Sequence, residues 1–309
     1  MATVCDCGVV GLGNLGTPNC QNIAQVTKRH IFVPYYDSTG VINGIEIATA
    51  NLDKAWFDAN LTNTDASKRW QISPVLENVT DERDDSITES LDSGKELFIQ
   101  QGTRTFEGVN VGQSPTYLGK LKTLKCNEVG VFEVDKGGNI VGRLSSDGLY
   151  LYPIRIDKDT FDPNFIKATD TTTAKVSVKF SYDTLEFDED LKLISRSDMG
   201  YNPLDLTSVI DVDLTDGGTA LSTEAISIEA TMDYGTALKG KAVEGLVLAD
   251  FDIKVGAVAH TADSVTETTA GVYVFDFTSD PFISADVVTS TLVSGIKAEA
   301  KAPLTQTIP

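Results

Sequence analysis

The sequence predicts a mainly β protein, with a β-sandwich or barrel domain that carries one short α-helix and a C-terminal immunoglobulin-like β-sandwich. Three observations predict this fold class. Short segments rich in Val, Ile, Thr, Tyr and Phe alternate with turns rich in Gly, Asp and Asn. One segment has a clear helix start signal followed by an amphipathic pattern. The amino-acid composition also changes near residue 205, after which arginine is absent.

Composition excludes several classes of function. The chain has 309 residues, a formal charge of −20 and a pI of about 4.4, so a protein that grips a nucleic-acid backbone with clustered Lys and Arg is not expected. An acidic surface past which DNA moves without sticking is compatible with this charge. No apolar run approaches the roughly 18 residues of a membrane span, and the N-terminus lacks the cationic region of a secretion signal. We therefore expect a protein made in a cytoplasm, with no membrane partner.

Residues 1–30 are expected to form an N-terminal arm, which contains three of the four cysteines, Cys5, Cys7 and Cys20. Together with His30 they could be drawn as a metal site, but their spacing matches none of the common zinc patterns. Four cysteines in a chain of this length do not make a disulfide scaffold. We expect small, buried or partly buried thiols and no metal.

The arm also contains a G-x-G-x-x-G pattern at Gly11, Gly13 and Gly16. A dinucleotide-binding turn needs a strand before this pattern, a helix that opens within it and an acid on a following strand. Asp37 falls near the right distance, but the residues after Gly16 are polar and turn-like and no βαβ pattern repeats. We expect a flexible glycine-rich arm and no cofactor.

The first globular domain is expected over residues 31–200. It opens with strand candidates, two of them bounded or interrupted by proline, at 31–33, 41–48 and 70–77. Residues 50–61 are expected to form a short helix with Asn51 as its cap, because apolar residues recur at helical spacing at Leu52, Ala55, Trp56 and Ala59.

The stretch Val79–Val109 is the part around which the rest of the chain is organised. Two strand-like segments flank an acidic middle, and Gly102 interrupts the second segment, Glu96–Val109, as a bulge or bend. The middle is opposed only by Arg83 and Lys95 and contains Asp81, Glu82, Asp84, Asp85, Glu89 and Asp92. Such a hairpin cannot bury much of itself. We expect it to form a sheet edge that other copies of the chain complete.

The clearest helix begins at Ser114–Pro115, an N-cap followed by a first-turn proline. It is expected to end near Asn127 and to cover an open sheet face with an apolar stripe made of Tyr117, Leu118, Leu121 and Leu124. Strands joined by tight turns follow. The last of them, Ala174–Tyr182, alternates cleanly and places on one face Val176, Val178 and Phe180.

A linker at residues 199–205 is expected to lead into an immunoglobulin-like decoration domain at 205–309. This last stretch has 16 acidic residues, 5 lysines and several short strand candidates separated by turn signals. No Cys–Trp–Cys signature is present, so the prediction depends on the strand pattern.

Catalysis is not expected. The two histidines, His30 and His260, fall in different expected domains, and no Ser or Cys nucleophile is tied to a base by spacing. Among 45 carboxylates many pairs lie close by chance, so a solvated acidic surface is the simpler interpretation. The cluster Asp81–Asp85 lacks the spacing of a calcium-binding EF-hand loop. We predict no enzyme, no catalytic residue and no cofactor.

The order of these features resembles the tail tube proteins of long-tailed bacteriophages. The resemblance is architectural: a long acidic β-hairpin, one short amphipathic helix and further strands, followed by a small immunoglobulin-like domain. Residues 245–255 and 271–277 also resemble a repeat style of bacterial and phage immunoglobulin-like domains. The resemblance implies a tail-tube-like β domain in a virion structural protein, whose subunits form hexameric rings. The rings stack into a tube through which DNA leaves the head.

The resemblance also implies roles for individual segments. Strands from every subunit would join one barrel, with Glu96–Val109 and Ala174–Tyr182 among them, while Asp81–Lys95 would reach the next ring and the arm would dock on a neighbouring subunit. An acidic lumen would repel DNA phosphates. The expected inter-subunit contacts are Asp81, Glu82, Asp84, Asp85, Glu89, Asp92, Phe98, Phe106, Val176, Val178 and Phe180.

Two alternatives stay open. The first is another phage structural protein, such as a capsid decoration or head-to-tail ring protein, which would also contact other virion proteins. The second is a surface carbohydrate-binding or adhesive protein, in which residues 205–309 would contact a host-surface glycan.

Overall fold

A computed structural model describes residues 23–48, 51–219, 221–293 and 298–309. The protein is mainly β, as predicted, with several sheets and two α-helices in these ranges. Contacts between Cα atoms divide the chain into two units: Met1–Trp56 with Ile72–Leu206, and Phe57–Gln71 with Thr207–Pro309. The boundary after Leu206 falls beside the linker expected from the sequence. The assignment of residues 57–71 to the second unit was not expected.

The N-terminal thiols and the glycine pattern of the arm, Cys5 to Cys20, lie outside the described residues. The hypotheses made for them therefore stay predictions. The arm itself is shorter than expected, because the first strand already begins at Thr27 and includes His30. Neither helix in the described ranges has the length and hydropathy needed to cross a membrane.

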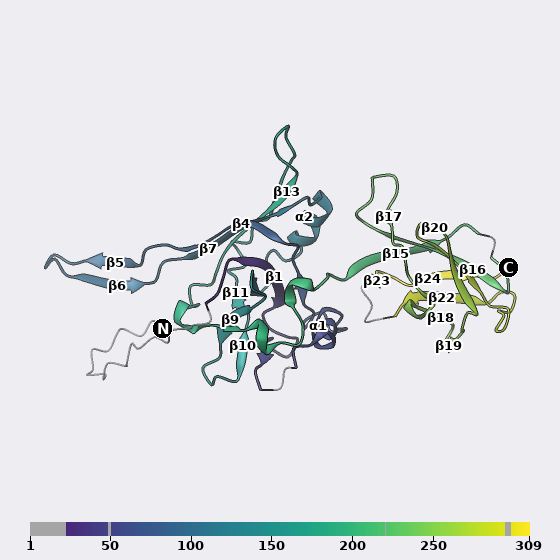
Figure 1. The fold of residues 1–309 in the computed structure, drawn as a ribbon, viewed down its shortest axis with the longest axis horizontal. Coiled ribbons are helices and arrows are strands. Elements are labelled where there is room, and N and C mark those ends of the chain that lie inside the picture. Colours follow the sequence, from purple (N-terminus) through teal and green to yellow (C-terminus); the bar gives the residue numbers. More distant parts are fainter. Residues whose placement is uncertain (1–22, 49–50, 220, 294–297) are drawn as a thin grey trace. The chain divides into compact units, whose positions relative to one another are not determined.

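Within the described residues the larger sheet of the first unit has eight strands, several of which are labelled in Figure 1. Its order is β2-β10-β9-β8-β1-β3, with β11 beside β8 and β14 beside β9. The strands are β1 (Thr27–Pro34), β2 (Ile45–Glu46), β3 (Gln71–Ile72), β8 (Val129–Asp135), β9 (Ile140–Leu144), β10 (Tyr150–Tyr152), β11 (Ile154–Arg155) and β14 (Leu191–Ile194). The strand expected over 41–48 is reduced to β2, and the residues before it pair only singly, as where the Asn43 N–H donates to the Tyr35 carbonyl at 3.0 Å.

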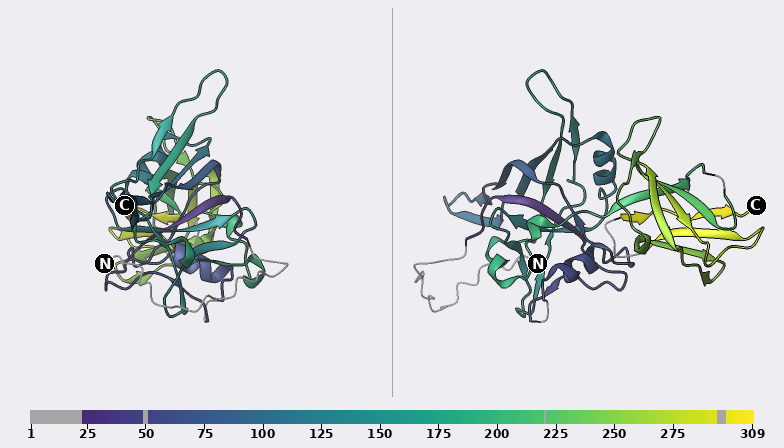
Figure 2. Two further views of the ribbon diagram at one scale, coloured as in Figure 1. Left: turned by 90° about the vertical axis from the view of Figure 1, so that its left-hand side faces the viewer. Right: turned by 45° about the vertical axis from the view of Figure 1, so that its right-hand side comes forward.

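The smaller sheet of the first unit has four antiparallel strands in the order β12-β13-β7-β4. They are β4 (Leu76–Arg83), β7 (Arg104–Val111), β12 (Asn164–Ile166) and β13 (Lys175–Ser181). A single apolar core joins the two sheets and contains Phe32 and Val131 from the larger sheet and Phe106 and Phe180 from the smaller one. Figure 2 shows the β12–β13 hairpin rising from this sheet.

The two helices are shorter than the sequence suggests. Helix α1 (Lys54–Leu61) is capped by Asp53, whose carboxylate accepts from the Trp56 N–H at 2.8 Å, so Asn51 is not the cap. Helix α2 (Pro115–Lys122) follows Ser114 as predicted and buries Tyr117 and Leu121. It ends well before Asn127 because the next residues tighten into three-residue turns, which begin with the Thr123 N–H donating to the Lys120 carbonyl.

The second unit is an immunoglobulin-like β-sandwich. Its larger sheet contains β15 (Ile210–Asp216), β16 (Ala225–Met232), β17 (Lys241–Ala242), β20 (Ser264–Thr269), β21 (Val272–Asp276) and β23 (Ala298–Ala300). Its smaller sheet contains β18 (Phe251–Val255), β19 (Val258–Ala259), β22 (Val287–Leu292) and β24 (Leu304–Thr307). One core joins both sheets and includes Ile228, Tyr273 and Phe275 of the larger one. The segment 57–71 is tied to this unit by Arg69, which binds the Glu299 carboxylate on β23 with both terminal nitrogens.

Candidate assembly surface

A two-stranded hairpin extends the smaller sheet of the first unit into solvent. Strands β4 and β7 continue into β5 (Ile87–Ser90) and β6 (Glu96–Gln100), which pair with each other and project away from the sheet (Figure 1). Every residue of 84–100 is exposed. An isolated hairpin of this kind is only marginally stable in water. We name residues 84–100 the distal hairpin.

The distal hairpin exposes large apolar side chains. Phe98 is 61% exposed, and the others are Ile87, Leu91, Leu97 and Ile99. Glu89 pairs with Leu97, and the Leu91 N–H donates to the Lys95 carbonyl at 2.8 Å. By strand alternation Leu91 and Leu97 therefore share one face with Glu89, and Phe98 lies on the other. Both faces combine apolar and acidic groups, which is the composition of a contact surface more than of a solvated loop.

A glycine lies where β7 meets the distal hairpin and lets the hairpin bend away from the sheet. We call this point the joint. The Asp84 N–H donates to the Thr103 carbonyl at 2.9 Å, which makes the last rung of the β4–β7 ladder. A Cβ atom built on Gly102 would lie 2.0 Å from the Asp84 carbonyl oxygen. Only glycine permits this approach of the two backbones, so the bend predicted at Gly102 has a steric cause.

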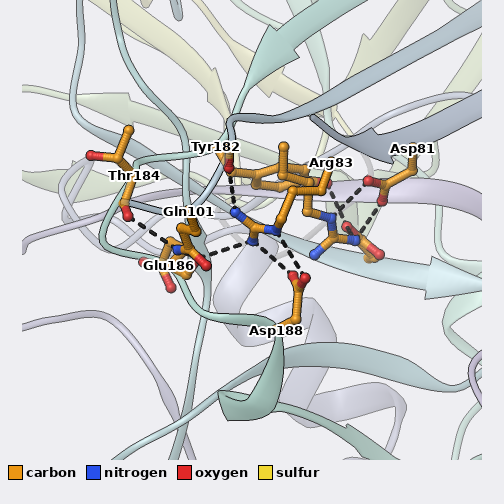
Figure 3. Close-up of polar contacts among 10 residues, drawn as sticks. Asp81, Arg83, Gln101, Tyr182, Thr184, Glu186 and Asp188 are labelled. Carbon is orange, nitrogen blue, oxygen red and sulfur yellow. Dashed lines mark hydrogen bonds and ion pairs between the residues drawn. The ribbon is translucent and has the colours of Figure 1, made fainter. Parts of the chain in front are cut away.

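The joint is held against the segment that follows β13, as Figure 3 shows. The Arg83 guanidinium binds both carboxylate oxygens of Asp188 at 2.8 Å and donates to the carbonyls of Gly102 and Glu186. Its hydrogen bonds lower the pKa of Asp188. Gln101 donates from its amide to the Glu186 carbonyl at 2.8 Å. We name these contacts the base clamp, and they fix the direction in which the hairpin leaves.

A buried polar cluster lies beneath the same ribbon. Arg104 binds both oxygens of Asp81, at 2.7 and 2.5 Å, and stacks 4.7 Å from the centre of the Tyr182 ring. The Tyr182 hydroxyl donates to Glu133 at 2.5 Å, and the Thr27 hydroxyl donates to its other oxygen. Burial raises the pKa of Glu133, and nearby Arg104 opposes that shift. Because its polar groups are largely paired inside the unit, this cluster is structural.

His30 lies fully buried in the core beside β7, and the hypothesis that joined it to the N-terminal cysteines stays a prediction. Its ring centre is 4.3 Å from that of Phe106, and Phe32 and Phe180 also surround it. Neither ring nitrogen has a hydrogen-bond partner. Burial lowers the pKa of His30 to about 3, which keeps the imidazole neutral at physiological pH.

The structure divides the expected contact residues into three groups. Glu82, Asp84, Asp85, Glu89, Asp92 and Phe98 are exposed, and of these the last five lie on the distal hairpin. Asp81 is half-buried and bound to Arg104, so it serves the interior. For the remaining four residues the predicted inter-subunit contact was wrong, because their side chains on β7 and β13 point into the core of their own chain. These residues are Phe106, Val176, Val178 and Phe180.

Sequence reasoning missed three features of this surface. The acidic middle of the ribbon is mostly strand, since β4 includes Asp81 and Glu82 and β5 includes Glu89. The exposed Leu91 and Leu97 were not singled out, although apolar residues between acids were a visible signal. The base clamp was not foreseen, because nothing local links Arg83 to Asp188.

The sheet itself has an open side and a polar face. Among the described residues no strand pairs with the outer edge of β4, although the Lys28 ammonium donates to the Leu76 carbonyl there. On the outward face, Glu107 pairs with Lys179 at 3.7 Å. By register the other charged residues of this face are Glu77, Glu82 and Lys175. The face is therefore close to charge balance.

No protein-family model and no curated protein matches this sequence.

Proposed function

We propose that this chain is a self-assembling structural subunit, which forms stacked rings of the kind that build a phage tail tube. One observation carries the proposal: the distal hairpin exposes apolar and acidic side chains on a fixed base, and none of the described residues of its own unit covers them. A monomer gains little from such an element. A second copy that covers it would bury the apolar groups and stabilise the pair of strands.

Open sheet edges support the same proposal. The outer edge of β4 carries backbone donors and acceptors that an adjacent strand from another copy would pair. Closure of several such sheets into one barrel removes every edge, and this accounts for a ring without any change of fold.

Passage of DNA is the most specific part of the proposal. The chain has a net charge of −20, so a tube of many copies would not retain a phosphate backbone. The near charge balance of the outward face of the four-stranded sheet implies that, if this face lines the tube, repulsion of DNA arises from other parts of the chain.

The test is assembly of the purified full chain, followed by sedimentation velocity and negative-stain electron microscopy. We expect rings or tubes. A variant in which a two-residue Asn-Gly turn replaces residues 85–102 keeps the β4–β7 ladder and should remain monomeric. If this variant formed the same rings or tubes as the parent chain, the hairpin would have no role in assembly. A parent chain that stayed monomeric at all concentrations would overturn the proposal itself.

DNA passage has a separate test. We expect no retention of double-stranded DNA by assembled tubes in a filter assay, even at about 50 mM salt, where phosphate contacts are strong. Retention that fell with added salt would contradict the proposed lumen.

A further inference from the structure

The lysine-rich region of helix α2 has no established role in the first unit. Residues 112–127 contain Lys120, Lys122 and Lys125 and no acidic residue, in a chain that has 45 acids and 25 basic residues. Lys122 and Lys125 are exposed, and within the described ranges neither forms an ion pair. The buried side of the helix is made by Tyr117 and Leu121. Lys122 and Lys125 therefore lie on the exterior without an ion-pair partner among the described residues.

Apolar side chains accompany these lysines at the same end of the sheet. Val111, the last residue of β7, is 48% exposed and Ile166 on β12 is 41% exposed. Both pair with Lys175 on the strand between them, so the three form a row across the sheet. This row faces outward, whereas α2 packs on the core face of the sheet, where the Tyr117 hydroxyl donates to Asn110. We therefore name only Lys122 and Lys125 the helix-end surface, whose charge is opposite in sign to that of the distal hairpin.

The two surfaces are complementary in charge. The distal hairpin has five acidic residues and one lysine, Lys95, together with exposed Leu and Phe side chains. The distal hairpin and helix α2 lie at opposite ends of β7, as Figure 1 shows. The eight residues of that strand extend for about 25 Å, so the hairpin cannot reach the helix of its own copy. Any contact between the two surfaces must join different copies.

We infer that the distal hairpin of one copy docks on the helix-end surface of the next. This inference rests on the proposed function and names the partner surface within it. The occupant is a second copy of this chain, because among the described residues the chain itself carries exposed lysines, Lys122 and Lys125, that complement the acidic hairpin. Since hairpin and helix are different surfaces, the junction is head-to-tail, and every junction in the assembly points the same way. Opposite charges at the rim set the register and speed the encounter, while the leucines and Phe98 supply buried area.

Charge reversal tests this inference in the full chain. We expect K122E/K125E and E89K/D92K each to abolish assembly, because the first makes the helix acidic and the second makes the hairpin tip, residues 89–95, wholly cationic, so that like charges meet at the junction. Mixed one to one, the two variants should assemble again, since each then meets an opposite charge on the other chain. The quadruple variant should also assemble alone. A control, K239E/K241E, makes the same charge change in the second unit and should assemble like the parent chain.

Several outcomes overturn the inference without touching the proposed function. If the parent chain assembles and K122E/K125E behaves like the control, the hairpin docks elsewhere. If circular dichroism shows both variants folded but their one-to-one mixture does not assemble, the hairpin again docks elsewhere. Should a reversal variant not fold, K122Q/K125Q replaces it, and assembly as strong as that of the parent chain would again overturn the inference. A parent chain that never assembles overturns the proposed function and this inference with it.

Discussion

The two halves of one β-ribbon have opposite environments. The proximal half, β4 and β7, buries Leu76 and Phe106 in the core of the first unit, whereas the distal half exposes Phe98 and every residue around it. Both halves have strand-forming sequences and both contain a phenylalanine. The difference arises because only the proximal half has a second sheet to pack on. Strand propensity therefore predicts that both halves form strands. Tertiary packing decides which half is buried in the core and which half stays exposed.

Truncation of one phenylalanine in each half should separate stability from assembly. Phe106→Ala removes a fully buried ring and should lower the free energy of unfolding by about 3–5 kcal/mol. Phe98→Ala should change it by less than about 0.5 kcal/mol, because the side chain is exposed, yet should weaken assembly. Urea denaturation and sedimentation velocity measure the two effects. Equal losses of stability in the two variants would remove the distinction between the halves.

Low pH should destabilise the first unit through His30, which lies on β1 and packs against Phe106 of the proximal half. The unfolded imidazole takes up a proton below its ordinary pKa of about 6.5, whereas the buried one stays neutral down to about 3. The unfolded state thus binds more protons between these values. Stability should fall as pH decreases through this window, by about 1.4 kcal/mol per pH unit over most of it.

The comparison with His30→Phe isolates this effect. Glu133 acts with the opposite sign just above its ordinary pKa, because its own pKa is raised in the folded state. The measurement is therefore the difference in urea stability between the parent chain and His30→Phe at pH 4.5 and pH 7. We expect the difference to favour the variant more strongly at the lower pH, and a pH-independent difference would contradict a neutral buried imidazole.

The joint between the halves should be sensitive to a single methyl group. Gly102→Ala places a Cβ against the Asp84 carbonyl oxygen, and relief of that overlap should cost about 1–3 kcal/mol of local stability. Hydrogen exchange of the Asp84 amide, which donates to Thr103, reports on the joint. Gly119→Ala in α2 is a matched control, because no atom would lie within 4 Å of the added Cβ and its backbone is not in the left-handed region. It should leave the Asp84 exchange rate unchanged.

The base clamp should affect direction more than stability. Arg83→Lys keeps the charge but loses the two-oxygen contact with Asp188, and partial exposure of the pair limits the cost to about 1 kcal/mol or less. A spin-label distance between positions 93 and 136, both changed to Cys in a chain whose four native cysteines are replaced by Ser, should broaden in the Arg83→Lys variant. An unchanged distribution would show that Gly102 alone sets the direction.

Sequence patterns alone were enough to predict the fold class, the strand at Lys175–Ser181, the start of α2 at Ser114 and the bend at Gly102. These features depend on alternation, turn residues and caps, which are local in the chain. Tertiary structure alone decided that Phe106, Val176, Val178 and Phe180 face their own core, that Arg83 binds Asp188, and that hairpin and lysine helix lie at opposite ends of β7. Such facts depend on which surfaces meet across long separations in sequence, and alternation shows that a strand has two faces without saying what covers either one.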